Sequence, residues 1–181
     1  MIHRFTREQG ALLVIDLQER LAAAMAPERL ERVVNRAKAA IEGAKALALP
    51  LAITEQYPKG LGPTLKPIAE AIPGFSPVEK SEFSAWLPAV KEKLAGRTSV
   101  LVTGMETHVC VFQTVRALKD AGLTPYVAVD AVLSRSDTDY RAGLELCRDL
   151  GAQLTTVEAA LFDALGRAGT PEFKAISNAV K

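Results

Sequence analysis

Apolar residues fall in short continuous runs along the chain, and the segments between these runs carry apolar residues at helical spacing. Continuous runs of this kind are typical of parallel strands that are buried on both faces. Six strands are predicted, at 10–15, 50–54, 77–81, 99–103, 124–130 and 151–156. Helices are predicted at 27–49, 84–94 and 107–122, from 136 onward and from 170 onward. The Pro- and Gly-rich stretch 55–77 is predicted to be a long loop with at most one short helix, near 64–71.

Strands that alternate with helices indicate βαβ units and a mostly parallel sheet. Right-handed crossovers place helices on both faces of such a sheet, so we expect a three-layer α/β/α fold. The 181 residues are enough for one α/β domain with a good core. No repeat, low-complexity segment or linker divides them, and a single domain over 1–181 is therefore predicted.

Charge is balanced and scattered along the chain, with 22 Lys and Arg against 21 Asp and Glu and a net charge of +1. Surfaces that bind nucleic acid or anionic membranes need clustered basic residues, so neither partner is expected. No apolar run approaches the ~20 residues that span a bilayer. The polar stretch 1–9 lacks the apolar core of a secretory signal. Two cysteines far apart make no disulfide framework, and a cytoplasmic location is expected.

Three chemically active side chains stand where predicted strands end. Asp16 closes the first strand, Lys80 lies at the end of the third, and Cys110 follows the fourth. Ligands of open parallel sheets bind outside the carboxyl ends of the strands, so these side chains can share one site. There Lys80 would favour the thiolate of Cys110, and Asp16 would accept the thiol proton.

Each of these three residues also has a plainer interpretation. An Asp at a strand end is often a turn former, a Lys after a strand is usually solvated, and a free Cys often packs as a small apolar residue. For Cys147, which continues an apolar helical stripe, we favour the packing interpretation.

The position of Cys110 at the start of a helix predicts an activated thiol. If Thr107 is the N-cap, Cys110 falls in the first turn, where unpaired N–H groups and the helix dipole favour an anion. We therefore expect the pKa of the Cys110 thiol to be lowered.

Several common catalytic motifs are absent from the sequence. There is no G-x-G-x-x-G after the first strand, no Walker A sequence and no G-x-S-x-G. The only two histidines, His3 and His108, have no metal-ligand spacing. Neither a cofactor nor a metal site is predicted.

Three motifs together resemble the isochorismatase-like (cysteine hydrolase) superfamily over essentially the whole chain. LLVIDLQ at 12–18 looks like its first-strand motif with the catalytic Asp, and KSEFSAW at 80–86 looks like its lysine motif. VTGMETHVCV at 102–111 looks like its strand, turn and nucleophile. The stretches 53–62 and 131–136 look most like the "isochorismatase domain-containing" branch.

The resemblance implies a Rossmann-like six-stranded parallel sheet and a catalytic triad of Asp16, Lys80 and Cys110. It also implies a cis peptide bond between Met105 and Glu106, and an oxyanion hole made by the N–H groups of Glu106 and Cys110. The implied reaction is hydrolysis of a small amide-like substrate, with a C–N bond cleaved through a thioester on Cys110. Relatives commonly assemble, so a homo-oligomer, either dimer or tetramer, is expected.

Two departures from relatives shape this expectation. The nicotinamidase branch binds a metal through Asp-x-His after the second strand, whereas this chain reads TEQY at 54–57, which favours a metal-independent enzyme. Isochorismatases proper cleave a vinyl ether by protonation from the Asp, and the presence of Cys110 favours amide chemistry instead. Ether cleavage by Asp16 and a non-catalytic binding or scaffold role remain alternatives.

Five further residues are candidates for the substrate pocket because of their position near these motifs. They are Gln18, Tyr57, Phe83, Trp86 and His108. Core packing is the alternative interpretation for each aromatic residue.

Overall fold

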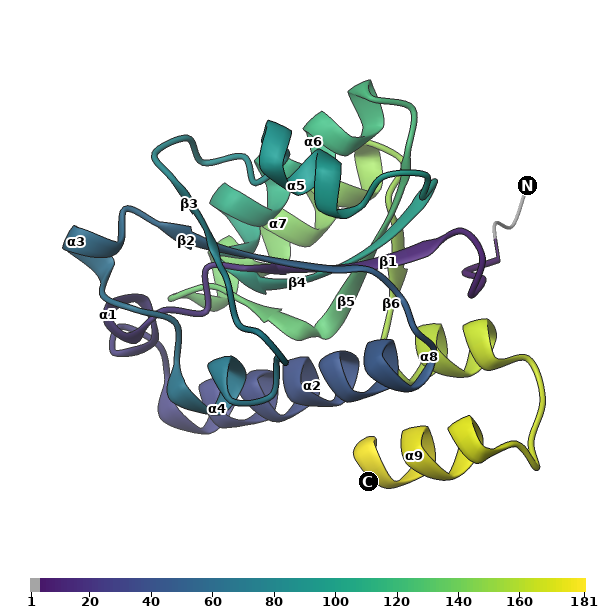
Figure 1. Cartoon of the computed structure of the whole chain (residues 1–181). Coiled ribbons are helices and arrows are strands. Elements are labelled where there is room, and N and C mark those ends of the chain that lie inside the picture. The colour runs from purple at the N-terminus through teal and green to yellow at the C-terminus, as the bar shows by residue number, and fades with distance from the viewer. Residues whose placement is uncertain (1–3) are drawn as a thin grey trace.

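The computed structural model describes residues 4–181, so His3 and the rest of 1–3 lie outside the described residues. Its centre is a parallel six-stranded sheet with the order β3-β2-β1-β4-β5-β6 (Figure 1). The predicted three-layer fold is confirmed. The strands are β1 (Gly10–Ile15), β2 (Leu51–Gln56), β3 (Val78–Lys80), β4 (Ser99–Met105), β5 (Thr124–Leu133) and β6 (Gln153–Thr155).

Helices cover both faces of the sheet. One layer contains α2 (Pro27–Ala46), α4 (Lys66–Ala69), α8 (Val157–Leu165) and α9 (Pro171–Ala179) (Figure 1). The other contains α5 (Pro88–Lys93), η1 (Thr107–Val111), α6 (Phe112–Asp120) and α7 (Asp137–Asp149). Two short helices, α1 (Glu19–Ala22) and α3 (Pro58–Leu61), lie near the carboxyl ends of the strands. Among residues 4–181, no helix combines the length and apolar character that crossing a membrane needs.

Strand β1 is buried along its whole length because its side chains alternate between two cores. Leu12 and Val14 pack with α2, whereas Leu13 and Ile15 pack with α6 and α7. The chain order reverses between β1 and its neighbour β4, which makes this pair the switch point of the sheet. Ligand sites of such sheets lie outside the carboxyl ends of the strands at this point.

The structure corrects the predicted 55–77 loop. Glu55 and Gln56 complete β2, and the remainder holds two short helices, α3 and α4, where at most one was expected. Helix α5 begins at Pro88, later than the predicted 84, because the backbone at 84–87 is irregular.

The prediction that the fifth strand ends at Asp130 was wrong. Strand β5 continues to Leu133, because the apolar residues that follow Asp130 are buried. The Asp130 carboxylate instead accepts a hydrogen bond from the N–H of Val157 (2.9 Å) at the start of α8. Helix α8 itself, and the short α1, were not predicted.

Candidate active site

The structure brings Asp16, Lys80 and Cys110 together at the carboxyl ends of β1, β3 and β4. Asp16 follows β1 in the left-handed backbone region with φ 50°, which turns its side chain out of the strand repeat. Its Oδ2 atom lies 2.7 Å from Nζ of Lys80, and both side chains are completely buried. Cys110 lies in η1 and is 5% exposed. A carboxylate, an ammonium and a thiol therefore share one site that is largely closed to water.

The Lys80 ammonium is held by a set of oxygen atoms. Its Nζ donates to Oε1 of Gln56 (2.6 Å) and to the carbonyl oxygens of Glu82 (3.2 Å) and Phe83 (3.1 Å). Gln56 is fixed in turn, because its Nε2 donates to the carbonyl oxygen of Ser81 (2.9 Å). A buried charge is tolerated when it is paired and hydrogen-bonded, and Lys80 meets both conditions.

The two oxygens of Asp16 have different surroundings. Oδ1 accepts a hydrogen bond from Oγ1 of Thr54 (2.7 Å). Oδ2 forms the ion pair with Lys80, and the carboxylate also interacts with the thiol of Cys110. Burial raises the pKa of the Asp16 carboxyl, and the Lys80 charge opposes that rise only in part. The Asp16 carboxyl therefore takes up a proton more readily than an ordinary Asp.

The expectation of a lowered pKa at Cys110 was wrong. Burial, together with the negative charge of Asp16, raises the pKa of the thiol to about 12, although the charge of Lys80 acts in the opposite direction. Burial alone also raises the pKa of Cys147 to about 12. Both thiols are therefore protonated at neutral pH, but only Cys110 lies beside a carboxylate.

The start of the helix that carries Cys110 also differs from the prediction. Glu106, not Thr107, is the N-cap, and residues 107–111 form a π-helical turn in which the N–H of Val111 donates to the carbonyl oxygen of Glu106 (3.2 Å). The peptide bond between Met105 and Glu106 is cis. Cys110 is buried within this turn instead of lying on an exposed first turn of an α-helix.

Gly104 allows β4 to approach β1 at the switch point. Its φ is 119°, a conformation that side-chain-bearing residues rarely adopt. A Cβ atom at this position would overlap the Ile15 carbonyl oxygen and would lie 2.7 Å from the nitrogen of Ile15. Only glycine fits between the Asp16 and Cys110 segments.

Several residues that support the site were missed from the sequence. In the sequence, Thr54 and Gln56 entered only as part of the TEQY stretch that departs from a metal motif. Their position as polar residues at the end of a buried strand was the signal that could have identified them as site residues. Thr114 joins two site segments, because its Oγ1 donates to the carbonyl oxygen of Cys110 (2.6 Å) and accepts from the N–H of Ala85 (2.8 Å). Arg135 binds the buried Glu106 carboxylate through its backbone N–H (3.2 Å) and its Nε (3.1 Å).

The five candidate pocket residues have different environments. Gln18 is completely buried, and its Nε2 donates to the carbonyl oxygens of Gln56 (3.0 Å) and Gly62 (2.7 Å). Tyr57 and Phe83 are 58% and 52% exposed beside the strand ends. Trp86 packs against the core on the α6 side, and Nδ1 of His108 lies 3.0 Å from Oγ of Ser134.

Helix α7 fixes the position of η1 through a glycine contact. A Cβ atom on Gly143 would lie 2.7 Å from the nitrogen of His108 and 2.8 Å from the carbonyl carbon of Thr107. Both atoms belong to backbone, so the turn that carries Cys110 would have to move to make room for it.

We expect Gly143→Ala to lower the free energy of unfolding by about 1–3 kcal/mol and to lower kcat as well. Ala142→Gly, at the exposed neighbouring position, weakens the same helix by about 1 kcal/mol without a contact to η1. It should leave kcat unchanged. Urea unfolding and steady-state kinetics on both variants test this, and an unchanged kcat in Gly143→Ala would contradict the positioning role.

Metal ligands are not grouped in the described part of the chain. Among residues 4–181 there is no set of three or more His, Cys, Asp or Glu side chains placed to hold a metal ion.

Comparison with known proteins places the chain in a family. The family model described as "Isochorismatase domain" matches residues 10–159. The isochorismatase domain-containing protein 2 of Bos taurus is 38% identical over 173 residues, which cover 94% of this chain and 82% of that protein.

Solved structures agree with this result. The MAR1 ribonuclease from Caenorhabditis elegans is 35% identical, with a TM-score of 0.92 over 98% of this chain and 92% of that one. YcaC from Escherichia coli, described as an octameric hydrolase of unknown specificity, is 21% identical. Its TM-score of 0.83 over 92% of this chain and 84% of that one shows a shared fold. This chain belongs to the isochorismatase family.

Proposed function

We propose that residues 1–181 form a single metal-independent hydrolase domain that cleaves the C–N bond of a small amide-like substrate through a thioester on Cys110. The observation that carries this proposal is the buried Asp16–Lys80 ion pair, whose carboxylate lies beside the protonated thiol of Cys110. A base next to a nucleophile that carries its own proton is the arrangement that covalent catalysis needs.

Acylation begins when Asp16 removes the Sγ proton as the sulfur attacks the carbonyl carbon of the substrate. The N–H groups of Glu106 and Cys110 stabilise the oxyanion that forms. Asp16 then gives its proton to the departing amine, and the C–N bond breaks to leave a thioester. Lys80 balances the negative charge of Asp16 while the carboxylate is ionised.

Deacylation uses the same carboxylate a second time. Asp16 removes a proton from water, and the resulting hydroxide attacks the thioester carbonyl. The C–S bond breaks, the carboxylic acid product leaves, and the sulfur recovers its proton from Asp16. We propose that Gln18, Tyr57, Phe83, Trp86 and His108 shape the space that the substrate occupies.

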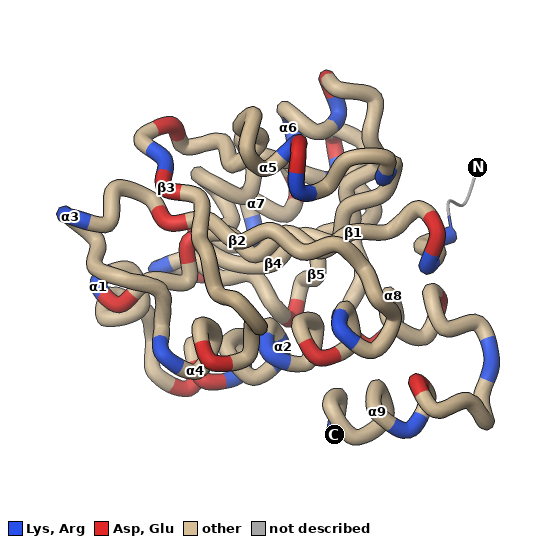
Figure 2. The backbone as a smooth tube through the Cα atoms, viewed as in Figure 1, with Lys and Arg blue, Asp and Glu red and all other residues tan. Residues whose placement is uncertain are grey.

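A small molecule, not a nucleic acid, is the substrate that we propose. The catalytic side chains are almost completely buried, which suits a compact substrate better than a polymer. Positive and negative residues are interspersed along the backbone (Figure 2), and the arginines that gather on α2 lie away from Asp16, Lys80 and Cys110. The name of the nematode relative makes RNA the comparison substrate to test.

A substrate panel tests the proposal directly. Ammonia release is measured with small aliphatic and aromatic primary amides, and cleavage of single-stranded RNA is measured beside it. We expect turnover of at least one amide, loss of that turnover in Cys110→Ala and no RNA cleavage. RNA cleavage that depends on Asp16 and Cys110 would overturn the choice of substrate.

The raised pKa values predict an unusual pH profile for kcat/KM. Asp16 must be ionised to accept the thiol proton, so activity should fall on the acid side at a pH well above the about 3.9 of an ordinary Asp. The thiol stays protonated up to about 12, so no loss should appear near the about 8.5 of a free Cys. Rates from about pH 4 to about pH 10 check both limbs. An acid limb at or below the ordinary Asp value would contradict this role for Asp16.

Ether cleavage is a second candidate, and the raised pKa of Asp16 favours it because a protonated carboxyl can serve as an acid. In that reaction Asp16 protonates a vinyl ether and Cys110 takes no part. Retention of activity in Cys110→Ala together with its loss in Asp16→Asn would support this candidate over amide hydrolysis.

We also propose that the protein forms a homo-oligomer in the cytoplasm. The octameric assembly described for YcaC supports self-association, and the two free, buried cysteines suit a reducing compartment. Light scattering after size exclusion tests the assembly, because a monomer at micromolar concentration would exclude it.

A further inference from the structure

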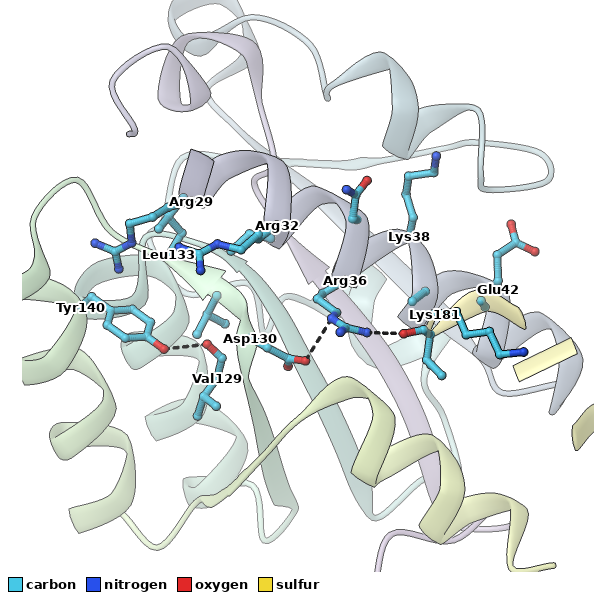
Figure 3. A pocket seen from close by; sticks show the side chains of 16 residues that line it. Arg29, Arg32, Arg36, Lys38, Glu42, Val129, Asp130, Leu133, Tyr140 and Lys181 are labelled. Carbon is cyan, nitrogen blue, oxygen red and sulfur yellow. Dashed lines mark hydrogen bonds and ion pairs between the residues drawn. The ribbon is translucent and has the colours of Figure 1, made fainter. Parts of the chain in front are cut away.

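A cavity lies apart from the candidate active site. It measures about 880 Å³, opens to solvent, and is lined by α2, the end of β5, Tyr140 of α7 and the end of α9 (Figure 3). Its volume is within the range of sites for small molecules. Asp16, Lys80 and Cys110 do not line it, so its role is independent of the proposed hydrolysis.

The residues that β5 contributes to the cavity lining are mostly apolar, and those at its rim on α2 are mostly basic. Strand β5 contributes Val129, Val132 and Leu133 to this lining, and of these only Val129 is partly exposed. Helix α2 contributes Arg29, Arg32 and Arg36 to the rim, at spacings of three and four residues that place them along one face of the helix. In Figure 3 the Arg29 and Arg32 side chains extend toward Tyr140, and that of Arg36 extends toward Asp130.

The acidic groups of the cavity are already paired. Asp130 faces Arg36 at 3.7 Å and also accepts the N–H at the start of α8. Glu42 is paired with Lys45 at 2.9 Å. The carboxylates that line the cavity therefore leave part of its positive charge unbalanced.

The three arginines of α2 differ in the ion pairs and hydrogen bonds that they form. Arg29 pairs with Asp137 and lies over the Tyr140 ring at 5.2 Å, and Arg36 also donates to the carbonyl oxygen of Val180 (2.7 Å). Arg32 has neither an ion pair nor a hydrogen bond within residues 4–181.

We infer that this cavity binds a small organic anion that has an apolar body. Its carboxylate or phosphate group sits on the free guanidinium of Arg32, between Arg29 and Arg36, because the guanidinium fork matches both groups. Its apolar body lies against the β5 side of the cavity, beside the half-buried Val129.

Calorimetric titration of the full chain tests this inference, with benzoate, phenyl phosphate, acetate and inorganic phosphate as the probes. We expect saturable binding of benzoate or phenyl phosphate that is tighter than that of acetate or inorganic phosphate and weakens as salt is added. The carboxylate and phosphate arms identify which head group the site prefers. Arg32→Ala should weaken binding roughly tenfold or more.

Arg148→Ala is the matched control, because Arg148 is exposed at the end of α7 and does not line the cavity. It should bind the probes as the wild type does. No saturable binding, equal affinity for benzoate and acetate, or full binding by Arg32→Ala would each overturn the inference. Dissociation of an oligomer by Arg32→Glu would also overturn it, since a second copy would then occupy the cavity.

Discussion

Asp16→Asn is expected to lower kcat for amide hydrolysis by about 10³-fold or more, because one carboxylate performs every proton transfer in the proposed cycle. An asparagine amide keeps the size of the side chain but cannot accept the thiol proton. It also leaves the Lys80 ammonium buried without its ion-pair partner. We therefore expect a loss of stability of about 3–5 kcal/mol beside the loss of rate.

Two further variants separate these effects. Thr54→Val removes the hydroxyl that donates to Oδ1 of Asp16 and keeps the carboxylate, so its rate should fall far less. Asp120→Asn makes the same chemical change at an exposed position at the end of α6 and should have no effect. Steady-state kinetics with thermal melts measure both quantities. Full activity in folded Asp16→Asn would show that another group transfers the protons.

Gly104→Ala is expected to have the largest effect on stability, about 3 kcal/mol or more. Its methyl group would overlap the backbone of Ile15, and backbone in the middle of a six-stranded sheet has no room to move. The positive φ adds a further cost. The change also pushes apart the strands that lead to Asp16 and Cys110, so any folded fraction should be inactive.

Gly96→Ala isolates the cost of the backbone conformation. Gly96 has φ 77°, and a Cβ atom there would meet nothing within 4 Å. This variant should lose only about 1–2 kcal/mol. Chemical denaturation of both variants gives the comparison, and equal losses at the two positions would contradict the steric argument for Gly104.

The sheet and the position of the site could be predicted because local sequence determines both. Continuous apolar runs identify parallel strands, and parallel strands align their carboxyl ends at one edge. Asp16, Lys80 and Cys110 directly follow or end such runs, so their convergence followed from the pattern. The family resemblance implied a six-stranded parallel sheet, and the structure has one. The order of the strands, with β1 beside β4, was not predicted.

The electrostatics of the site could not be predicted, because burial is a property of the whole fold. A helix start predicts a lowered pKa for Cys110 only if that turn is exposed, and η1 is instead covered by α7 at Gly143. The pairing of Gln56 with Lys80 also depends on a contact between neighbouring strands. Likewise, Asp130 looked like a strand end because its partner, the start of α8, lies 27 positions away.

The central claim is that Cys110 becomes acylated during turnover, and acid quenching followed by intact-protein mass spectrometry tests it most directly. With an amide from the substrate panel, we expect an adduct of the acyl mass in the wild-type protein. Peptide mapping should place this adduct on Cys110, with none on Cys147, and it should be absent from Cys110→Ala. Steady product formation with no adduct, in a protein whose Cys110→Ala variant is equally active, would contradict the thioester mechanism.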